Sequence, residues 1–189
     1  MEFTDISADI SEILYTEEQL QARLAEMARE IERDYAGKEV LIVGVLKGAV
    51  IVISDLIREL KFHAHIDFMA VSSYGASTQS SGVVRIVKDL DSDLRGKHVL
   101  IVEDIIDSGL TLAWIVRNLE LRHPESIEVC AMLRKPEAKV EDVRVKYVGF
   151  DIPNKFVVGY GLDYAEKYRN IRGVGVLNPS VYSDGDPHA

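Results

Sequence analysis

Hydrophobic residues near the start of the chain recur at the spacing of one helix face. These positions are Leu20, Leu24, Met27, Ala28, Ile31 and Tyr35. Thr16 and Gln19 form a capping-box pattern directly before them, and Gly37 follows where a helix should end. The pattern therefore predicts an amphipathic helix between Thr16 and Gly37 that packs on a core through one face.

Most of the remaining apolar residues form continuous runs of strand length rather than an alternating pattern. The runs span residues 39–45, 66–71, 83–88, 98–102, 127–133 and 145–150. Apolar segments of helix character, 49–60 and the face Leu112, Ile115, Val116 and Leu119, lie between them, while 72–82 is small, polar and glycine-bearing like a long loop. Strands that are hydrophobic throughout and separated by helices predict an α/β fold, with a parallel sheet covered by helices on both faces.

Length and composition narrow the classes of protein. A chain of 189 residues with 47% hydrophobic and 28% charged residues is typical of one globular domain. The net charge of −9 argues against a nucleic-acid partner, because protein surfaces that bind nucleic acids usually carry clustered Lys and Arg residues. No secretory signal or membrane-length apolar run is evident, and the single cysteine, Cys130, rules out an intrachain disulfide. A cytoplasmic location without a membrane partner is therefore expected.

Two acidic residues, Glu103 and Asp104, follow the apolar run 98–102 without a break. Ligands of open parallel sheets bind beyond the carboxyl ends of the strands, which is where these carboxylates should lie. Neighbouring carboxylates repel each other, and no lysine or arginine stands near them in the sequence to neutralise them. They could accept hydrogen bonds from two adjacent sugar hydroxyls or hold a hard cation such as Mg²⁺.

The next residues, 105–111, should form a turn that leads into a helix. Asp107, Ser108, Gly109 and Thr111 combine a glycine that permits close approach with hydroxyl donors at a helix N-terminus. That combination suits a phosphate monoester. The alternative is an acidic surface loop in which Asp107 or Ser108 caps the helix.

The whole stretch VLIVEDIIDSGLTL resembles the phosphoribosyl diphosphate-binding signature of the purine phosphoribosyltransferases, in particular the hypoxanthine(-guanine) branch. The segments VGVLKGA (43–49), SSYG (72–75), RKP (134–136) and 149–170 agree with the same family, so the resemblance covers roughly residues 10–182. It implies a single type I phosphoribosyltransferase domain over 1–189. The core would span roughly 35–150, a small hood would come from the N-terminal segment and 151–182, and 183–189 would be a tail.

The resemblance implies that a 5-phosphoribosyl group moves from phosphoribosyl diphosphate to a purine nitrogen, with Mg²⁺ as cofactor. Asp107 would be the general base for the purine proton. The phosphoribosyl diphosphate would contact Lys47, Gly48, Ser73, Tyr74, Glu103, Asp104, Asp107, Ser108, Gly109, Leu110, Thr111 and Arg169. Ser73 and Tyr74 would lie on a mobile loop that closes over the reacting centre. Some relatives carry a basic residue at position 110, so Leu110 leaves phosphate binding to backbone and hydroxyl donors. The family also has a cis peptide between the residues that match Leu46 and Lys47.

The base pocket is expected from the 135–169 region. Lys135 would donate to the 6-oxo group and so exclude adenine, Phe156 would stack on the ring, and the Val157 backbone would read its edge. Asp163 would lie near the base and hold a second Mg²⁺, beside the metal ligands Glu103 and Asp104. Without the resemblance, Phe156 reads as a core residue and Arg169 as half of a surface ion pair.

Two rival functions stay open. The first is an RNA-binding regulator that keeps the phosphoribosyl site, as pyrimidine attenuation proteins do. Asp107 and the charge of −9 disfavour it. The second is an inactive phosphosugar-binding subunit, which the filled catalytic positions disfavour. The resemblance also implies a homodimer or homotetramer, and it does not rank hypoxanthine, guanine and xanthine as substrates.

Overall fold

The computed structural model describes residues 1–73, 84–141 and 143–182. Its main sheet has six strands in the order β4-β3-β2-β5-β6-β7. They are β2 (Val40–Leu46), β3 (His65–Ser73), β4 (Val84–Lys88), β5 (His98–Ile106), β6 (Ser126–Arg134) and β7 (Tyr147–Asp151). All neighbours pair in parallel except β3 and β4, which are antiparallel.

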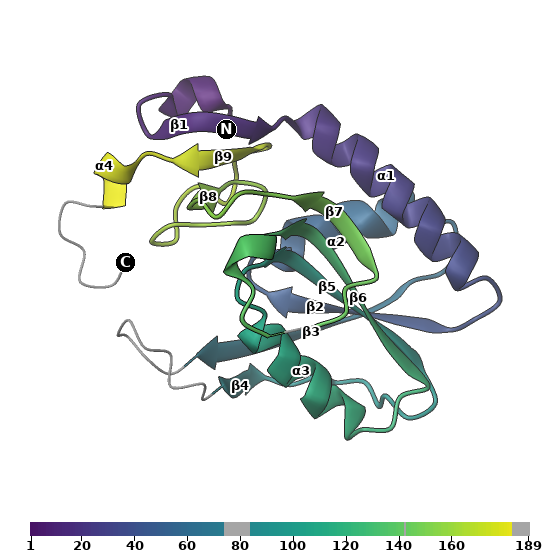
Figure 1. Ribbon diagram of the computed structural model, residues 1–189. Helices are drawn as coiled ribbons and strands as arrows, with labels where there is room; N and C mark the ends of the chain where they lie inside the picture. Colours follow the sequence, from purple (N-terminus) through teal and green to yellow (C-terminus); the bar gives the residue numbers. More distant parts are fainter. Residues whose placement is uncertain (74–83, 142, 183–189) are drawn as a thin grey trace.

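One face of the sheet is covered by α1 (Glu17–Asp34) and α2 (Ala49–Glu59), as Figure 1 shows. The capping box predicted for α1 is present, since the Thr16 side chain accepts from Gln19 N and the Gln19 side chain accepts from Thr16 N. The predicted apolar face is confirmed, because Leu20, Leu24, Met27, Ala28, Ile31 and Tyr35 are all buried. They pack with α2 and with alternate residues of the strands into one core cluster.

The opposite face is covered by α3 (Leu110–Glu120), whose buried residues include Leu112, Ile115 and Leu119. These pack on the other set of alternate strand residues, such as Val43 and Ile101, to form a second core cluster. Because both faces of the central strands are covered, their sequences are apolar throughout. The predicted fold class, an α/β parallel sheet with helices on both faces, is confirmed.

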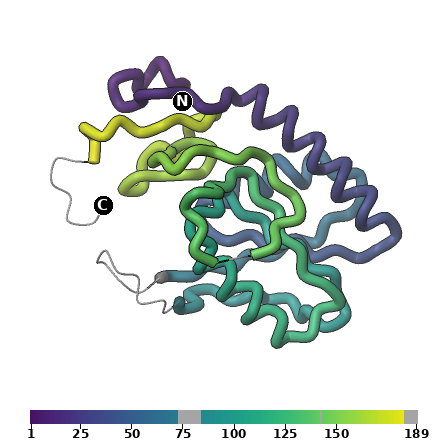
Figure 2. Tube along the Cα trace, viewed as in Figure 1, coloured from purple at the N-terminus to yellow at the C-terminus, as the bar shows by residue number. Residues whose placement is uncertain are grey.

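A second, smaller sheet lies over the carboxyl-end side of the main one (Figures 1 and 2). It joins β1 (Ile10–Tyr15), β9 (Val174–Leu177) and β8 (Val157–Val158) in antiparallel order. Two 3₁₀ turns, η1 (Phe3–Ile6) and η2 (Pro136–Ala138), and the short α4 (Pro179–Tyr182) complete the fold. The small sheet therefore brings the two ends of the described chain side by side above the main sheet.

Two local expectations were wrong. The strand expected to stop at residue 102 continues to Ile106, because Glu103, Ile105 and Ile106 still pair with β6. The run 83–88 was expected to join a parallel sheet, but β4 runs antiparallel to β3. Only ten residues, 74–83, separate β3 from β4, and a parallel crossover usually needs about a dozen or more residues.

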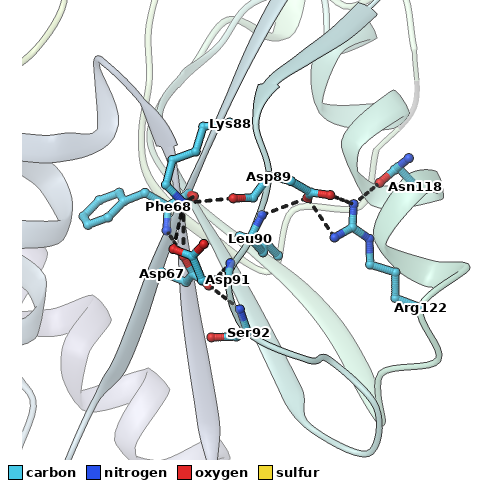
Figure 3. A network of polar contacts seen from close by, with 9 residues as sticks. All are labelled: Asp67, Phe68, Lys88, Asp89, Leu90, Asp91, Ser92, Asn118 and Arg122. Carbon is cyan, nitrogen blue, oxygen red and sulfur yellow. Dashed lines mark hydrogen bonds and ion pairs between the residues drawn. The ribbon is translucent and has the colours of Figure 1, made fainter.

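The connection from β4 to β5 is fastened to the sheet by a buried carboxylate (Figure 3). Asp67 on β3 accepts hydrogen bonds from the backbone N–H groups of Phe68 (2.7 Å), Asp91 (2.9 Å) and Ser92 (2.9 Å). Burial alone would raise the pKa of Asp67, but these hydrogen bonds outweigh it, so the pKa lies below its ordinary value. The network holds in place the loop that leads into β5, the strand that carries the acidic stretch.

Candidate active site

The winding of the main sheet reverses between β2 and β5, because the chain proceeds from β2 to β3 on one side and returns to β5 on the other. A crevice at the carboxyl ends of two such strands is the usual ligand site of an open α/β sheet. Here β2 ends at Leu46, which is followed by Lys47 and Gly48, and β5 ends at Ile106. The peptide bond between Leu46 and Lys47 is cis, as the resemblance implied.

The loop between β5 and α3 is shaped for an anion. Gly109, the N-cap of α3, has φ +80°, and a Cβ atom there would lie 2.9 Å from the Glu141 carbonyl oxygen. Ser108 Oγ accepts a hydrogen bond from Leu110 N at 3.4 Å. Glu103, Asp107, Ser108, Gly109, Thr111 and their neighbours line a depression of about 130 Å³. The predicted phosphate loop thus sits at the start of a helix, where unpaired N–H groups attract negative charge.

The two acidic residues of β5 are shielded from solvent to different degrees, since Asp104 is only half-buried. Glu103 is buried, and burial together with the neighbouring Asp104 raises its pKa well above the ordinary range. Burial also raises the pKa of Asp104 to about 6, although Arg169 counteracts part of this effect. A Cβ atom at position 48 would overlap the Asp104 carboxylate, so any larger residue there would force this side chain to move.

Arg169 supplies a positive charge near Asp104, which has no basic neighbour in the sequence. Its Nη2 lies 2.8 Å from Asp163 Oδ1, and its Nη1 donates to the Gly161 carbonyl oxygen at 2.9 Å. Arg169 Nε is buried and has no hydrogen-bond partner among the residues that the structure describes. Arg169 was expected to form a surface ion pair if the family resemblance was set aside. Its ion pair with Asp163 is instead partly buried at the edge of the crevice, and one guanidinium donor has no partner among the described residues.

Asp107 and Lys135 meet beside the phosphate loop. Lys135 Nζ lies 2.7 Å from Asp107 Oδ2, and the Lys135 side chain is 8% exposed while that of Asp107 is 54% exposed. The backbone N–H of Lys135 donates to the Ile106 carbonyl oxygen at 2.9 Å, which fixes the two strand ends to each other. A cavity of about 330 Å³ opens next to the pair, with Val143 and Val145 among its apolar walls. A proton acceptor and a cationic donor therefore face one partly apolar space.

Phe156 and Val157 do not line that cavity. Phe156 is 41% exposed, an unusual exposure for a phenylalanine expected in a core, whereas Val157 is buried. The Phe156 ring lies 5.7 Å from the Tyr164 ring and 5.3 Å from the Tyr182 ring. Phe156 thus keeps an exposed aromatic surface available for stacking.

Other predicted positions lie at the crevice or outside the described chain. Lys47 Nζ lies 3.0 Å from Glu166 Oε1, and both side chains are largely exposed. Thr111 lies in the first turn of α3. For Ser73 the structure describes the backbone, which pairs with Val84, and Tyr74 falls outside the described residues.

Sequence reasoning missed Glu166 and Gly161. Glu166 bridges Lys47 and Arg169, and its backbone N–H donates to Asp163 Oδ2 at 2.9 Å. Gly161 packs directly on the Gly48 backbone. The signal in the sequence is the Gly-Tyr-Gly pattern at 159–161, which indicates a turn but does not by itself indicate what the turn contacts.

A parallel sheet with acidic residues and a glycine-bearing loop at its switch point is the arrangement of an α/β protein that binds a ligand at the carboxyl ends of its strands. The family model "Phosphoribosyl transferase domain" matches residues 11–165. The chain belongs to this family of phosphoribosyl transferases.

Similar proteins indicate which branch of the phosphoribosyl transferase family the chain resembles. The chain is 57% identical over 180 residues to a hypoxanthine-guanine phosphoribosyltransferase of Mycobacterium avium, covering 92% of this chain and 89% of the relative. It is 48% identical over 174 residues to the enzyme of the same name from Bacillus subtilis, covering 92% and 97%. A crystal structure of a hypoxanthine phosphoribosyltransferase from Staphylococcus aureus superposes with a TM-score of 0.92 at 46% identity, covering 95% of this chain and 98% of that one. The predicted family and the predicted class, a transferase of a pentosyl group, are confirmed.

Proposed function

We propose that the crevice binds phosphoribosyl diphosphate and an oxopurine, and transfers the 5-phosphoribosyl group to hypoxanthine and to guanine. The products are the nucleoside monophosphate and diphosphate, a reaction of purine salvage. The observation that carries the proposal is the Asp107–Lys135 pair at 2.7 Å, which faces a cavity directly beside the phosphate loop. That pair offers both an acceptor for a ring proton and a donor for a 6-oxo group.

The 5-phosphate would lie in the 107–111 loop, on the N-terminus of α3, held by backbone N–H groups and the hydroxyls of Ser108 and Thr111. Glu103 and Asp104 would accept hydrogen bonds from the ribose hydroxyls. Lys47, the Gly48 backbone and Arg169 would contact the diphosphate, Arg169 with the Nε donor that has no partner in the described chain. Ser73 and Tyr74 would close the crevice over the reacting centre.

In the chemical step, the bond from C1 of the ribose to diphosphate breaks and a bond from C1 to a purine nitrogen forms. Charge develops on the sugar as the bond breaks, so carboxylates held close to it stabilise the transition state. The attacking ring loses a proton, which Asp107 would accept, while the electron pair of the broken bond leaves with the diphosphate. Lys135 would donate to the 6-oxo group, Phe156 would stack on the ring, and the Val157 backbone and Asp163 would contact its edge.

The carboxylates fit Mg²⁺ that arrives with its substrate. Mg²⁺ is usually held by one or two carboxylates together with substrate phosphates rather than by an all-protein cage. No cluster of three or more metal-binding side chains occurs in the described ranges. Glu103, Asp104 and Asp163 are the residues that would hold the ion, directly or through water, and bound Mg²⁺ would neutralise the diphosphate charge. Burial is the main cause that raises the pKa values of Glu103 and Asp104.

The cellular setting is part of the proposal. No helix in the described part of the chain is long and apolar enough to cross a membrane. We propose a cytoplasmic enzyme that acts as a homodimer or homotetramer, with a core of roughly 35–150 under a hood from the N-terminal segment and 151–182. Sedimentation at micromolar concentration tests the assembly, and a monomer would contradict it.

The test of substrate choice compares initial rates with hypoxanthine, guanine, xanthine and adenine at saturating phosphoribosyl diphosphate and Mg²⁺. Hypoxanthine and guanine should be turned over and adenine should not. Lys135→Gln should raise the KM for hypoxanthine, whereas Lys139→Gln, a change on the same cavity wall, should not. Turnover of adenine at a comparable rate would refute the role of Lys135.

A further inference from the structure

A buried hydroxyl–carboxylate contact ties the segment after β8 to the two helices behind the crevice. The Tyr160 hydroxyl donates to Asp55 Oδ2 at 2.7 Å, and Gln21 Nε2 donates to the same oxygen at 2.6 Å. Asp55 lies on α2 and Gln21 on α1, while Tyr160 is 4% exposed. None of these three side chains contacts substrate in the proposed mechanism, so the contact needs another explanation.

The backbone around Tyr160 is held in a conformation that a tyrosine rarely adopts. Gly159, Tyr160 and Gly161 have φ values of +98°, +50° and +100°. A non-glycine residue with positive φ persists only where its surroundings fix it. Here the Tyr160 backbone N–H donates to the Ile171 carbonyl oxygen at 2.9 Å, and its side chain is fixed by Asp55.

The same turn forms one wall of the proposed diphosphate subsite. A Cβ atom at position 161 would overlap the Gly48 carbonyl oxygen, so the two backbones are in direct contact. Gly161 N donates to the Arg169 carbonyl oxygen at 3.0 Å, and Arg169 Nη1 donates to the Gly161 carbonyl oxygen at 2.9 Å. Any shift of Gly161 would therefore move both the Gly48 backbone and the Arg169 guanidinium.

The two contacts lie on one helix. Gly48 is the N-cap of α2, and Asp55 is seven residues further along, which is about two turns or roughly 10 Å. Residues 160 and 161 therefore contact α2 at two points. The Gly161 backbone contacts its N-terminus at Gly48, and the Tyr160 side chain contacts Asp55 about two turns further along. Two separated contacts define the orientation of the turn, whereas one would leave it free to pivot.

We propose that Tyr160 is a positioning residue for the diphosphate subsite, which acts through Asp55 to hold Gly161, and with it Gly48 and Arg169, at the correct height over the crevice. The inference rests on the proposed role of Gly48 and Arg169 in diphosphate binding. It predicts an effect mainly on phosphoribosyl diphosphate, because Gly48, Gly161 and Arg169 do not line the cavity beside Lys135.

The chain offers a matched control for the variant Tyr160→Phe. Tyr147 is also a buried tyrosine of the same core cluster, and its hydroxyl donates to the Asp34 carboxylate at 3.0 Å. Asp34 ends α1 and Tyr147 begins β7, where no predicted site residue lies. Tyr147→Phe therefore removes an equivalent hydrogen bond without touching the crevice.

The experiment measures kcat, both KM values and the melting temperature of the full-length wild type and of the two variants. Tyr160→Phe should raise the KM for phosphoribosyl diphosphate about 5- to 15-fold, the size of one lost hydrogen bond. Its KM for hypoxanthine and its kcat should stay within about threefold. Tyr147→Phe should lower the melting temperature similarly and leave both KM values unchanged. Asp55→Asn combined with Tyr160→Phe should add little to the larger single effect, because both changes break one contact.

Equal KM values for Tyr160→Phe and Tyr147→Phe, with similar loss of stability, would overturn the inference and leave Tyr160 as a packing residue. An Arg169→Gln variant separates this failure from a failure of the proposed site. If Arg169→Gln raises the KM for phosphoribosyl diphosphate while Tyr160→Phe does not, the site stands and the inference falls. If neither variant raises it, the assignment of the diphosphate subsite is wrong, and the inference falls with it.

Discussion

Replacing Asp107 with asparagine separates the two roles that this carboxylate has in the proposed mechanism. In the structure it forms an ion pair with Lys135 at 2.7 Å, and during the reaction it would accept a proton from the purine. Asparagine keeps the shape of the side chain and an oxygen that Lys135 can still donate to. It removes the negative charge and the basicity.

The two roles differ enough in magnitude to be told apart. The Asp107 side chain is 54% exposed, so solvent screens its ion pair, and such pairs contribute at most about 1 kcal/mol. A loss of that size corresponds to roughly a fivefold effect. General base catalysis contributes about 10²- to 10⁴-fold in rate, or about 2.7 to 5.5 kcal/mol. A large fall in kcat for Asp107→Asn therefore cannot come from the lost ion pair alone.

The assay measures kcat with both substrates saturating, and measures phosphoribosyl diphosphate binding separately by calorimetry. We expect Asp107→Asn to lose about 10²- to 10⁴-fold in kcat with nearly unchanged phosphoribosyl diphosphate affinity. Lys135→Gln breaks the same ion pair from the other side but leaves the base, so its main loss should be in the KM for hypoxanthine. A kcat for Asp107→Asn within about tenfold of wild type would refute the assignment and reduce Asp107 to a residue of the loop.

Three further outcomes test other parts of the structure. Asp67→Asn should lower the free energy of unfolding by about 1.5 to 3 kcal/mol near pH 7, because three backbone N–H groups lose a charged acceptor. The folded-state pKa of Asp67 is depressed, so this stabilisation is present above the ordinary pKa of 3.8 and is lost as the pH falls through the folded-state pKa. Urea titrations of wild type and variant should therefore show a smaller difference in unfolding free energy near pH 3 than near pH 7. An equal difference at both pH values would contradict this explanation. Gly48→Ala would push against the Asp104 carboxylate and should raise the KM for phosphoribosyl diphosphate at least about tenfold in steady-state assays; an unchanged KM would show that the two groups are not in contact in solution. Removing divalent cations with a chelator should abolish turnover and added Mg²⁺ should restore it, whereas full activity in excess chelator would refute the role of Glu103 and Asp104 as metal ligands.

The main sheet and its helices were predictable because their signals are local. Continuous apolar runs identified every strand of the main sheet, and the capping box with its apolar spacing identified α1. The small sheet was not predictable in this way, since β8 has two residues and β9 has four, too few to show a period. β9 pairs with β8 on one side and, on the other, with β1 from the opposite end of the chain.

In the candidate site, too, residues close together in the sequence were predictable and contacts between distant segments were not. The phosphate loop and its carboxylates lie within nine consecutive residues, 103–111, so their chemistry could be inferred from one stretch of sequence. The contacts of Lys47 with Glu166, and of Gly48 with Gly161, join segments more than a hundred residues apart. No periodicity or motif encodes such pairs, because they depend on how the small sheet lies over the main one. The role of Arg169 near Asp104 belongs to this second group.

The position of Arg169 also explains why the acidic crevice is only partly neutralised. The Arg169 guanidinium lowers the pKa of Asp104 but already pairs with Asp163, while Glu103 is buried beside another carboxylate and has a strongly raised pKa. Because burial disfavours their charged forms, Glu103 and Asp104 destabilise the fold, and increasingly so as the pH rises and they lose their protons. A ligand that brings hydroxyl donors and a divalent cation would remove this unfavourable free energy when it binds. The removal would add to the binding free energy of the ligand and would stabilise the folded protein. If basic side chains of the chain paired with both carboxylates, the fold would be more stable. The carboxylates would then be equally satisfied in the free and the bound state, and ligand binding would gain less free energy from them.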